Sequence, residues 1–455
     1  MGGRRQLVAA VTGAATLTIA PGVARAHDVT ASRFDAPLPL SLLFAGAAGA
    51  VVLTAVLLAT TERSPSGTRR VVTLSPRVAR AGRALAGATF FAGVVAAVVV
   101  GIGGPRAAAG NFATVFVWPV WFRGVALLAV LVGTPWPALS PWRAAYRWLC
   151  RLEGGEVRLV GPPPARLGAW PAFLSLVLLV GVVENLTVLP RSPPLTAAVV
   201  AVYGLWSVGG AALFGPLWLA RADPLGLLYR LFGRVAPVET ARTDAGLVVS
   251  LRPPWHAATR SVAGPAVVAT VIVAVYTVTF DGFTETRLYR DLLLAVREGL
   301  GTGPPTSVPL YLLGLAAFLA VFLAAVRLGD ALGGPTNIRV GPARAFAPTV
   351  LPIAAAYDVA HNYPYVVRST ARLADIVAGV GAFDPLAALL LPAYWGSQVA
   401  LVVLGHLIAV VAADRVACAR YPTRAAARRG HLPLVAVMVG YTVLSLWVVS
   451  RPIVG

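Results

Sequence analysis

Long apolar runs separated by short connections constrain this chain more than any other feature. A helix needs about twenty mainly apolar residues to cross the roughly 30 Å of hydrocarbon in a bilayer, and ten runs reach that length. The chain is therefore expected to be an all-α, polytopic transmembrane helix bundle. The expected spans are 38–61, 82–103, 112–134, 169–190, 194–219, 262–281, 307–328, 346–368, 392–414 and 431–450.

The composition agrees with an integral membrane protein whose main partner is the lipid bilayer. Hydrophobic residues make up 58% of the 455 residues and charged residues only 12%, against about 25% charged in a typical soluble domain. All 38 basic residues are arginine and the net charge is +20. These arginines fall in short loops, where they set topology. No basic segment is long enough to form a nucleic-acid reader, so no nucleic acid is expected as a partner.

The first residues have the pattern of a secretory signal peptide. "MGGRR" is followed by a short apolar stretch and a small-x-small end at Ala24 and Ala26, which predicts cleavage after Ala26. Residues 1–26 are then the signal peptide, and residues 27–455 form one integral membrane domain that begins at His27 outside the cytoplasm. An uncleaved membrane anchor is the alternative.

The distribution of arginine tests this topology. With His27 outside, the connections on the cytoplasmic side hold 24 arginines, and those on the outer side hold nine. This asymmetry is what the positive-inside rule predicts for a protein of the plasma membrane. Ten crossings then leave both termini outside. Two connecting segments, 221–237 inside and 281–301 outside, mix leucines with arginines and predict amphipathic helices, the inner one lying on the leaflet surface.

Ionisable residues within the apolar runs are the candidate functional residues, because such residues are costly in a membrane and usually face the bundle interior. At a rise of 1.5 Å per residue, Glu184 lies about 8 Å below the outer surface, His361 about 10 Å and Asp358 about 15 Å. Arg123 is expected near the midplane and Asp281 at the outer rim. The sequence thus predicts a polar pocket in the outer half of the membrane.

Two interpretations of this pocket remain open. In the first, His361 is a general base or metal ligand, with Asp358 or Glu184 orienting it. In the second, Asp358 or Glu184 pairs with Arg123, and His361 bonds between helices. Asp358 and His361 share a helix face because they are spaced i, i+3, and Pro364 loosens the backbone beside them. The remaining polar residues expected to line the pocket are Arg123, Asn185, Asp281, Asn362 and Gln398.

The sequence gives only weak indications of a cofactor. The candidate ligands for a divalent metal are His361 and His27, and the amino group and imidazole of His27 together suit Cu(II). No dense metal-ligand motif occurs. A haem held by His361 and His406 is not expected, because the predicted spans put these residues about 10 Å apart in depth.

Several segments together resemble a family of multi-pass prokaryotic membrane proteins described as fenitrothion hydrolase-like. They include "AHDVTASRFDAPLPLSLLFAGAA", "RADPLGLLYRLFGRVAP", "LPIAAAYDVAHNYPYVV" and "YWGSQVALVVLGHLIAVVAADRVA". The resemblance implies hydrolysis of a small lipophilic substrate, an organophosphate triester, by activated water. The family tends to have a histidine where this chain has Ala413, just before Asp414. The resemblance assigns no catalytic residue.

Two functions from different classes are therefore expected as alternatives. One is a membrane hydrolase in which Glu184, Asp358 and His361 are the catalytic residues. The other is a transporter, or an accessory or assembly membrane protein, with an ion or solute path through the same residues. Proline-interrupted helices of the kind that line transport sites favour the second slightly.

Overall fold

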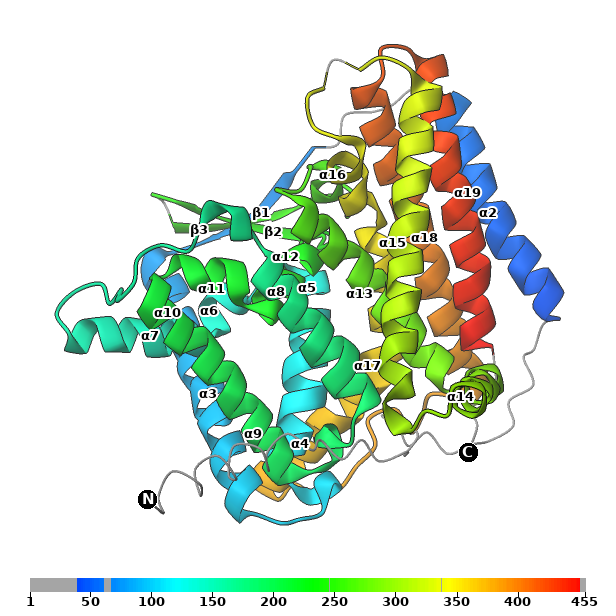
Figure 1. Ribbon diagram of the computed structural model, residues 1–455. Coiled ribbons are helices and arrows are strands. Elements are labelled where there is room, and N and C mark those ends of the chain that lie inside the picture. Colours follow the sequence, from blue (N-terminus) through cyan, green and yellow to red (C-terminus); the bar gives the residue numbers. More distant parts are fainter. Residues whose placement is uncertain (1–38, 61–66, 245, 337, 451–455) are drawn as a thin grey trace, which may run out of the picture.

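The computed structural model describes residues 39–60, 67–244, 246–336 and 338–450, and these residues form a bundle of long helices (Figure 1). The predicted signal peptide and His27 lie outside the described residues. The all-α class is confirmed: helices make up most of the described chain, and the strands are three short ones.

Nine helical segments in the described chain are long and apolar enough to cross a membrane. They correspond to nine of the ten predicted spans, so the protein is a multi-pass membrane protein. The segments are α2 (Leu40–Thr60), α3 (Pro76–Gly103), α4–η2–α5 (Phe112–Val132), η3–α8–η4 (Ala165–Glu184), α9–η6–α10 (Pro193–Phe214), α13 (Pro265–Thr284), η8–α15 (Pro304–Gly333), α18 (Leu391–Arg420) and α19 (Arg424–Val449).

The predicted span 346–368 is the exception. It forms most of α17 (Leu351–Ala378), a helix of 28 residues that is not among the nine apolar segments. Its polar and charged residues lower its hydropathy, but its length is sufficient to cross. α17 packs against α13, α18 and the π-helical segment η2 (Phe116–Gly124), so it lies inside the bundle. In α13 itself, 16 of 20 residues are buried.

Hydrogen bonds between connections place alternate loops at the same end of the bundle. Arg221 donates to the carbonyl of Pro163, Arg344 to that of Val262, and Arg420 to that of Val340. These bonds link four of the five arginine-rich connections predicted to be cytoplasmic. At the opposite end, Arg372 in the C-terminal part of α17 donates to the carbonyl of Ala109. α17 therefore carries the chain from one end of the bundle to the other, as the tenth crossing requires.

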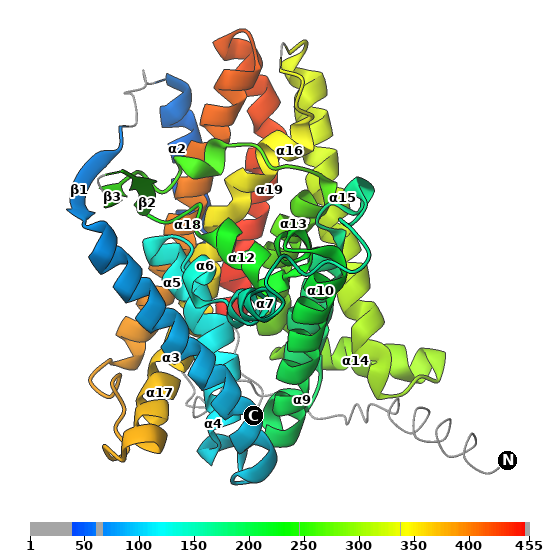
Figure 2. The ribbon, with the colours of Figure 1, turned by 90° about the vertical axis from the view of Figure 1, so that its left-hand side faces the viewer.

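A small antiparallel sheet was not predicted. Its order is β1-β3-β2, and it joins the connection before α3 to the one before α13. β1 leads directly into α3 (Figure 2). The strands are β1 (Arg69–Leu74), β2 (Val238–Thr243) and β3 (Gly246–Leu251). The sheet brings the fifth arginine-rich connection to the same end of the molecule as the others.

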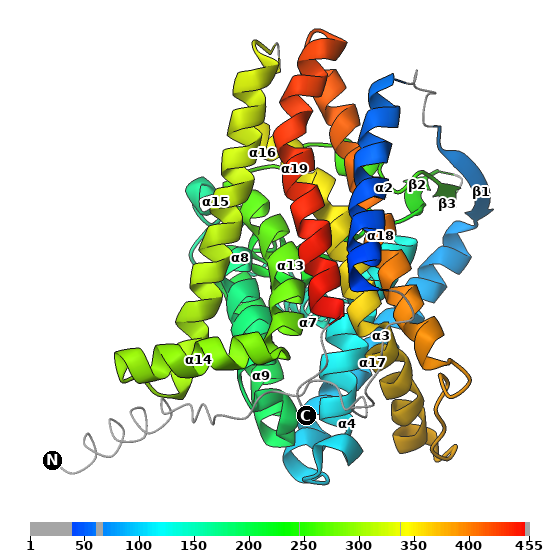
Figure 3. The same ribbon diagram turned by 90° about the vertical axis from the view of Figure 1, so that its right-hand side faces the viewer.

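The two amphipathic predictions had different outcomes. The inner one was wrong: α12 (Pro224–Phe232) has eight of its nine residues buried. It packs between α5 (Val125–Val132) and α8 (Trp170–Leu176) inside the bundle. The outer one is confirmed, because α14 (Arg287–Leu300) is largely exposed and runs crosswise to the long helix α15 (Figure 3).

The remaining elements are short and lie in the connections. They are η1 (Ala108–Gly110), α6 (Trp136–Leu139), α7 (Pro141–Leu152), η5 (Leu189–Arg191), α11 (Leu217–Ala222), η7 (Ala257–Thr259), α16 (Pro342–Phe346) and η9 (Ala347–Val350).

Candidate functional site

Arg123 lies in an irregular part of its span. Residues 116–124 form the π-helical segment η2, which contains Pro119. A proline in a helix interior lacks the N–H for the usual i to i−4 bond and displaces the carbonyl it would meet. π-Helical turns are rare and occur frequently at functional sites. The Arg123 side chain is only 8% exposed, so its charge must be compensated inside the protein.

Two carboxylates provide that compensation. Arg123 Nε donates to Glu184 Oε1 at 2.8 Å, and Arg123 Nη1 donates to Asp358 Oδ1 at 3.1 Å. Glu184 is the last residue of a second π-helical segment, η4 (Val177–Glu184), and Asp358 lies on α17. Asn362, one turn further along α17, donates to Asp358 Oδ1 at 3.1 Å. We call these four residues the Arg123 cluster.

The Arg123 cluster contains polar atoms that no neighbour satisfies. Glu184 Oε2, Asp358 Oδ2 and Asn362 Oδ1 are buried and have no hydrogen-bond partner among the described residues, and neither has Asn185 Nδ2. A buried polar atom without a partner costs about 1–3 kcal/mol. Three of these four atoms are acceptors, so the cluster has capacity for a proton or another positively charged donor.

A hydrogen-bonded pair of a histidine and an aspartate lies next to the cluster. His361 Nε2 is 3.2 Å from Asp281 Oδ2, and this contact links α17 to α13. His361 follows Asp358 by three residues and so lies on the same face of α17. Its ring also contacts the ring of Tyr357 edge-on. The structure thus brings together six of the residues predicted from the sequence: Arg123, Glu184, Asp281, Asp358, His361 and Asn362.

Glu285 extends this group toward the C-terminal end of α13 and was missed by the sequence reasoning. It caps the C-terminal end of α13, four residues after Asp281, a spacing that puts both on one helix face and could have identified it. Burial raises the pKa of the Glu285 carboxyl to about 7; the His361 imidazole opposes this shift and the Asp281 carboxylate adds to it. Glu285 can therefore exchange protons near neutral pH.

Tyr229 and Asp223 lie near the Arg123 cluster and were not predicted. The Tyr229 hydroxyl is within 3.1 Å of the carbonyl oxygens of Trp121 and Phe122, the two residues before Arg123. Asp223 caps α12 and accepts from Trp136 Nε1 at 2.6 Å and from the Tyr203 hydroxyl at 2.5 Å. These contacts fix α12 against the π-helical segment that carries Arg123. A carboxylate directly before a proline and an apolar run is a helix-cap signal that could have identified Asp223.

Gln398 has a role that follows from Pro364. Proline cannot donate to the carbonyl four residues earlier, which is that of Ala360. Gln398 Nε2 on α18 donates to this carbonyl at 3.1 Å, so a neighbouring helix satisfies the atom that Pro364 leaves without its helical partner. His406 is separate from the site: its ring is fully buried and its Nδ1 bonds the carbonyl of Val402 on its own helix, at 2.8 Å.

The metal hypothesis finds no ligand set in the described part of the chain. No three histidine, cysteine, aspartate or glutamate side chains there lie in an arrangement that could hold a metal ion. His361, the candidate ligand within the bundle, bonds to Asp281. His27 lies outside the described residues.

The chain was compared with family models, curated proteins and solved structures. None of the three comparisons gives a match. The resemblance to the fenitrothion hydrolase-like family therefore stays a prediction, and the site geometry is the basis for any functional proposal.

Proposed function

We propose that this protein is a membrane transport protein that binds and releases protons at the Arg123 cluster. The observation that carries the proposal is the cluster itself. Three helical segments bring two carboxylates onto one buried arginine and leave an oxygen of each carboxylate without a partner. Intramembrane chains of Asp, Glu and His are typical of proton relays in pumps and transporters.

The balance of charges supports proton binding. Glu184, Asp281, Asp358 and Glu285 supply four carboxyl groups, whereas Arg123 and His361 supply one guanidinium and one imidazole. Full ionisation, even with a charged imidazole, leaves two excess negative charges. An uncompensated charge in a low-dielectric interior is so costly that the group takes up a proton instead. The group is therefore expected to hold protons and to release them when its surroundings change.

The arrangement of these residues suits a path toward the outer end. The Arg123 cluster lies within the bundle, the His361–Asp281 pair is adjacent, and Glu285 follows at the end of α13. The irregular helices provide a means of changing the path. η2 and η4 are π-helical, and α17 contains Pro364. Interrupted helices of this kind often form the sites of transporters.

Neutralising one carboxyl of the cluster should stop proton movement. In proteoliposomes that contain a pH-sensitive dye and carry an imposed membrane potential, Glu184→Gln and Asp358→Asn are each expected to lower proton uptake about tenfold or more, because a relay needs every titratable member. The matched control is Asp330→Asn, since Asp330 also pairs with an arginine, Arg420 at 2.7 Å, but away from the cluster. Uptake that is absent in the wild type, or unchanged in both cluster variants, contradicts the proposal.

A purely structural cluster is distinguished by infrared spectroscopy. If Glu184 or Asp358 binds a proton, the wild-type protein shows a protonated-carboxyl band that changes with pH. This band is expected to be lost or reduced in Glu184→Gln or Asp358→Asn. If the cluster only holds helices together, its carboxyl groups do not exchange protons with the solution, and no pH-dependent band is lost in either variant.

Ester hydrolysis is the second candidate, favoured by an apolar pocket beside α13. This pocket has a volume of about 750 Å³ and is lined partly by Thr279, Phe280 and Phe283. Asp281, the partner of His361, lies between them in sequence. A lipophilic ester in the pocket would therefore be close to the helix that holds the His361–Asp281 pair.

The hydrolase candidate has its own test. Membranes that contain the wild-type protein are expected to release nitrophenol from a lipophilic phosphotriester, and His361→Ala and Asp358→Asn are expected to abolish this release, because the attacking water would lose its base. Asp330→Asn serves again as the control. Equal release from the two site variants and the wild type would contradict the assignment of these residues.

A further inference from the structure

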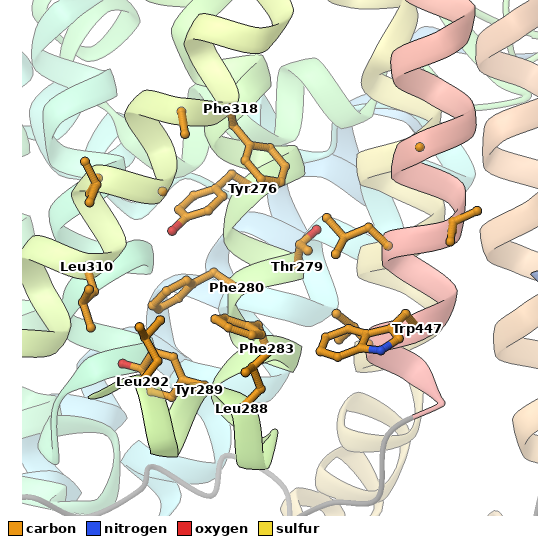
Figure 4. A pocket seen from close by; sticks show the side chains of 17 residues that line it. Tyr276, Thr279, Phe280, Phe283, Leu288, Tyr289, Leu292, Leu310, Phe318 and Trp447 are labelled. Carbon is orange, nitrogen blue, oxygen red and sulfur yellow. The ribbon is translucent and has the colours of Figure 1, made fainter. Parts of the chain in front are cut away.

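An apolar pocket opens on the surface of the bundle between α13, α14, α15 and α19 (Figure 4). Its volume is about 750 Å³, within the range of sites that hold a small ligand. Aromatic side chains provide much of its wall, from Tyr276, Phe280, Phe318 and Trp447. The residues of the Arg123 cluster are not part of this wall, so the pocket is separate from the proposed proton site.

The position of the pocket indicates what fills it. Leu313 on α15 and Leu444 on α19 line the pocket and are also exposed on the outside of the bundle. Both helices belong to segments apolar enough to cross a membrane. Their exposed faces therefore lie in hydrocarbon, and the molecules with direct access to the pocket are those dissolved in the bilayer.

One polar group in the wall has no partner in the part of the chain that the structure describes. Tyr289 on α14 is only 6% exposed, and its hydroxyl makes no hydrogen bond. Burial raises the pKa of Tyr289 to about 12, so the hydroxyl stays protonated and can donate. A buried hydroxyl without an acceptor is unfavourable. An occupant that supplies an acceptor oxygen would remove this cost.

α14 also supplies positive charge at the same end of the pocket. Leu288 and Leu292 line the pocket from one face of this helix. Arg287 and Arg290, in its first turn, are exposed. An amphipathic helix of this kind lies at the interface between lipid headgroups and hydrocarbon. Its arginines are therefore at headgroup level, where they attract anionic lipids.

We propose that this pocket binds one acyl chain of an anionic membrane phospholipid, with an ester carbonyl of that lipid accepting a hydrogen bond from Tyr289 and its phosphate lying at α14. The apolar walls match the acyl chain of a phospholipid, and the Tyr289 hydroxyl, which lacks an acceptor, matches its ester. The arginines of α14 match its headgroup. The site does not depend on the proposed proton path.

A photoactivatable lipid tests the site directly. The full-length chain is reconstituted in vesicles of phosphatidylethanolamine and phosphatidylglycerol that contain a little phosphatidylglycerol with a diazirine in one acyl chain. After illumination, mass spectrometry of peptides is expected to find the label concentrated on segments 310–318 and 440–448, which line the pocket. Even labelling of all lipid-facing helices would overturn the proposal.

A filled pocket should exclude the label. Gly440 lines the pocket, and a Cβ added there meets no atom within 4 Å, so Gly440→Leu places a side chain in the cavity without a backbone clash. Labelling of segment 310–318 is expected to fall about tenfold in this variant, because the leucine side chain occupies the volume that the acyl chain needs in a closely packed protein. Gly49→Leu on α2, where a Cβ also meets nothing, is the control and should label as the wild type does.

A second cavity-filling variant keeps the test valid if Gly440→Leu does not fold. Leu292→Trp enlarges a side chain of α14, outside the nine apolar segments, and is expected to lower the labelling in the same way. Unchanged labelling in a folded cavity-filling variant would overturn the site.

The hydroxyl is tested separately. Tyr289→Phe keeps the ring but removes the donor. The amount of unlabelled phosphatidylglycerol that halves the labelling should therefore rise about fivefold, which corresponds to the loss of one hydrogen bond. Competition equal to that of the wild type would overturn the contact between Tyr289 and the lipid ester.

Discussion

Arg123→Met is expected to lower the free energy of unfolding by about 3–5 kcal/mol, since it leaves two buried carboxylates without their counter-charge. The Glu184 and Asp358 side chains are only 10% and 3% exposed, so water cannot replace the guanidinium. The methionine keeps much of the side-chain volume, which separates the loss of charge from the creation of a cavity. Unfolding of the detergent-solubilised protein in increasing SDS measures the effect.

An exposed arginine that also pairs with an aspartate provides a matched control. Arg368 pairs with Asp384 at 3.2 Å, but both side chains are more than 40% exposed. Exposed pairs of this kind contribute about 0–1 kcal/mol, so Arg368→Met should unfold nearly as the wild type does. Equal effects of the two substitutions would mean that the Arg123 cluster is solvated and does not depend on its ion pairs.

Removing all the charges of the cluster separates stability from function. The variant Arg123→Met, Glu184→Gln, Asp358→Asn has no buried charge left to compensate, and breaking a buried pair is far more costly than replacing it entirely. This triple variant is expected to regain most of the lost stability and still to take up no protons. If the cluster only joins helices, the triple variant should recover both its stability and its proton uptake.

The sequence was sufficient to predict the nine apolar helical segments of the described chain and the residues of the cluster. Apolar length predicts a span because the bilayer has a fixed thickness. Buried charge predicts a site because each ionisable group in the bundle needs a partner. The three ionisable residues of the cluster come from segments far apart in the chain. Each could be recognised because an ionisable side chain within an apolar span is energetically unfavourable unless it has a partner. Of the two interpretations left open, the direct pairing of Arg123 with both carboxylates is the one that the structure contains.

The irregular parts of the fold could not be predicted in this way. η2 and η4 have the same apolar composition as regular helix, and their π-helical turns depend on local packing as well as on Pro119. The sheet pairs strands from connections that are more than 150 residues apart, so no local pattern marks it. α12 and the residues beside it have leucines and arginines in the pattern of an interfacial helix, but hydrogen bonds with neighbouring segments hold α12 inside the bundle.

Asp223 is the residue that holds α12 there, and Asp223→Ala is expected to cost on the order of 3–6 kcal/mol, the sum of several buried donors left without an acceptor. Its carboxylate, 1% exposed, accepts hydrogen bonds from Trp136 Nε1, the Tyr203 hydroxyl and the backbone N–H of Gly226. These bonds connect α12 to α6 and α9 and also cap its first turn. SDS unfolding measures the cost, with Trp fluorescence reporting the environment of Trp136.

A graded series identifies the cause of that effect. Asp223→Asn keeps one acceptor oxygen but turns an amide N–H toward one of the donors, so its cost should be intermediate. Tyr203→Phe removes a single donor and should cost about 1–2 kcal/mol. Because Tyr229 on α12 bonds the carbonyls of Trp121 and Phe122, a displaced α12 should also disturb Arg123. Proton uptake should therefore decrease in the order of the lost stability, and uptake that stays constant across the series would show that the cluster does not depend on α12.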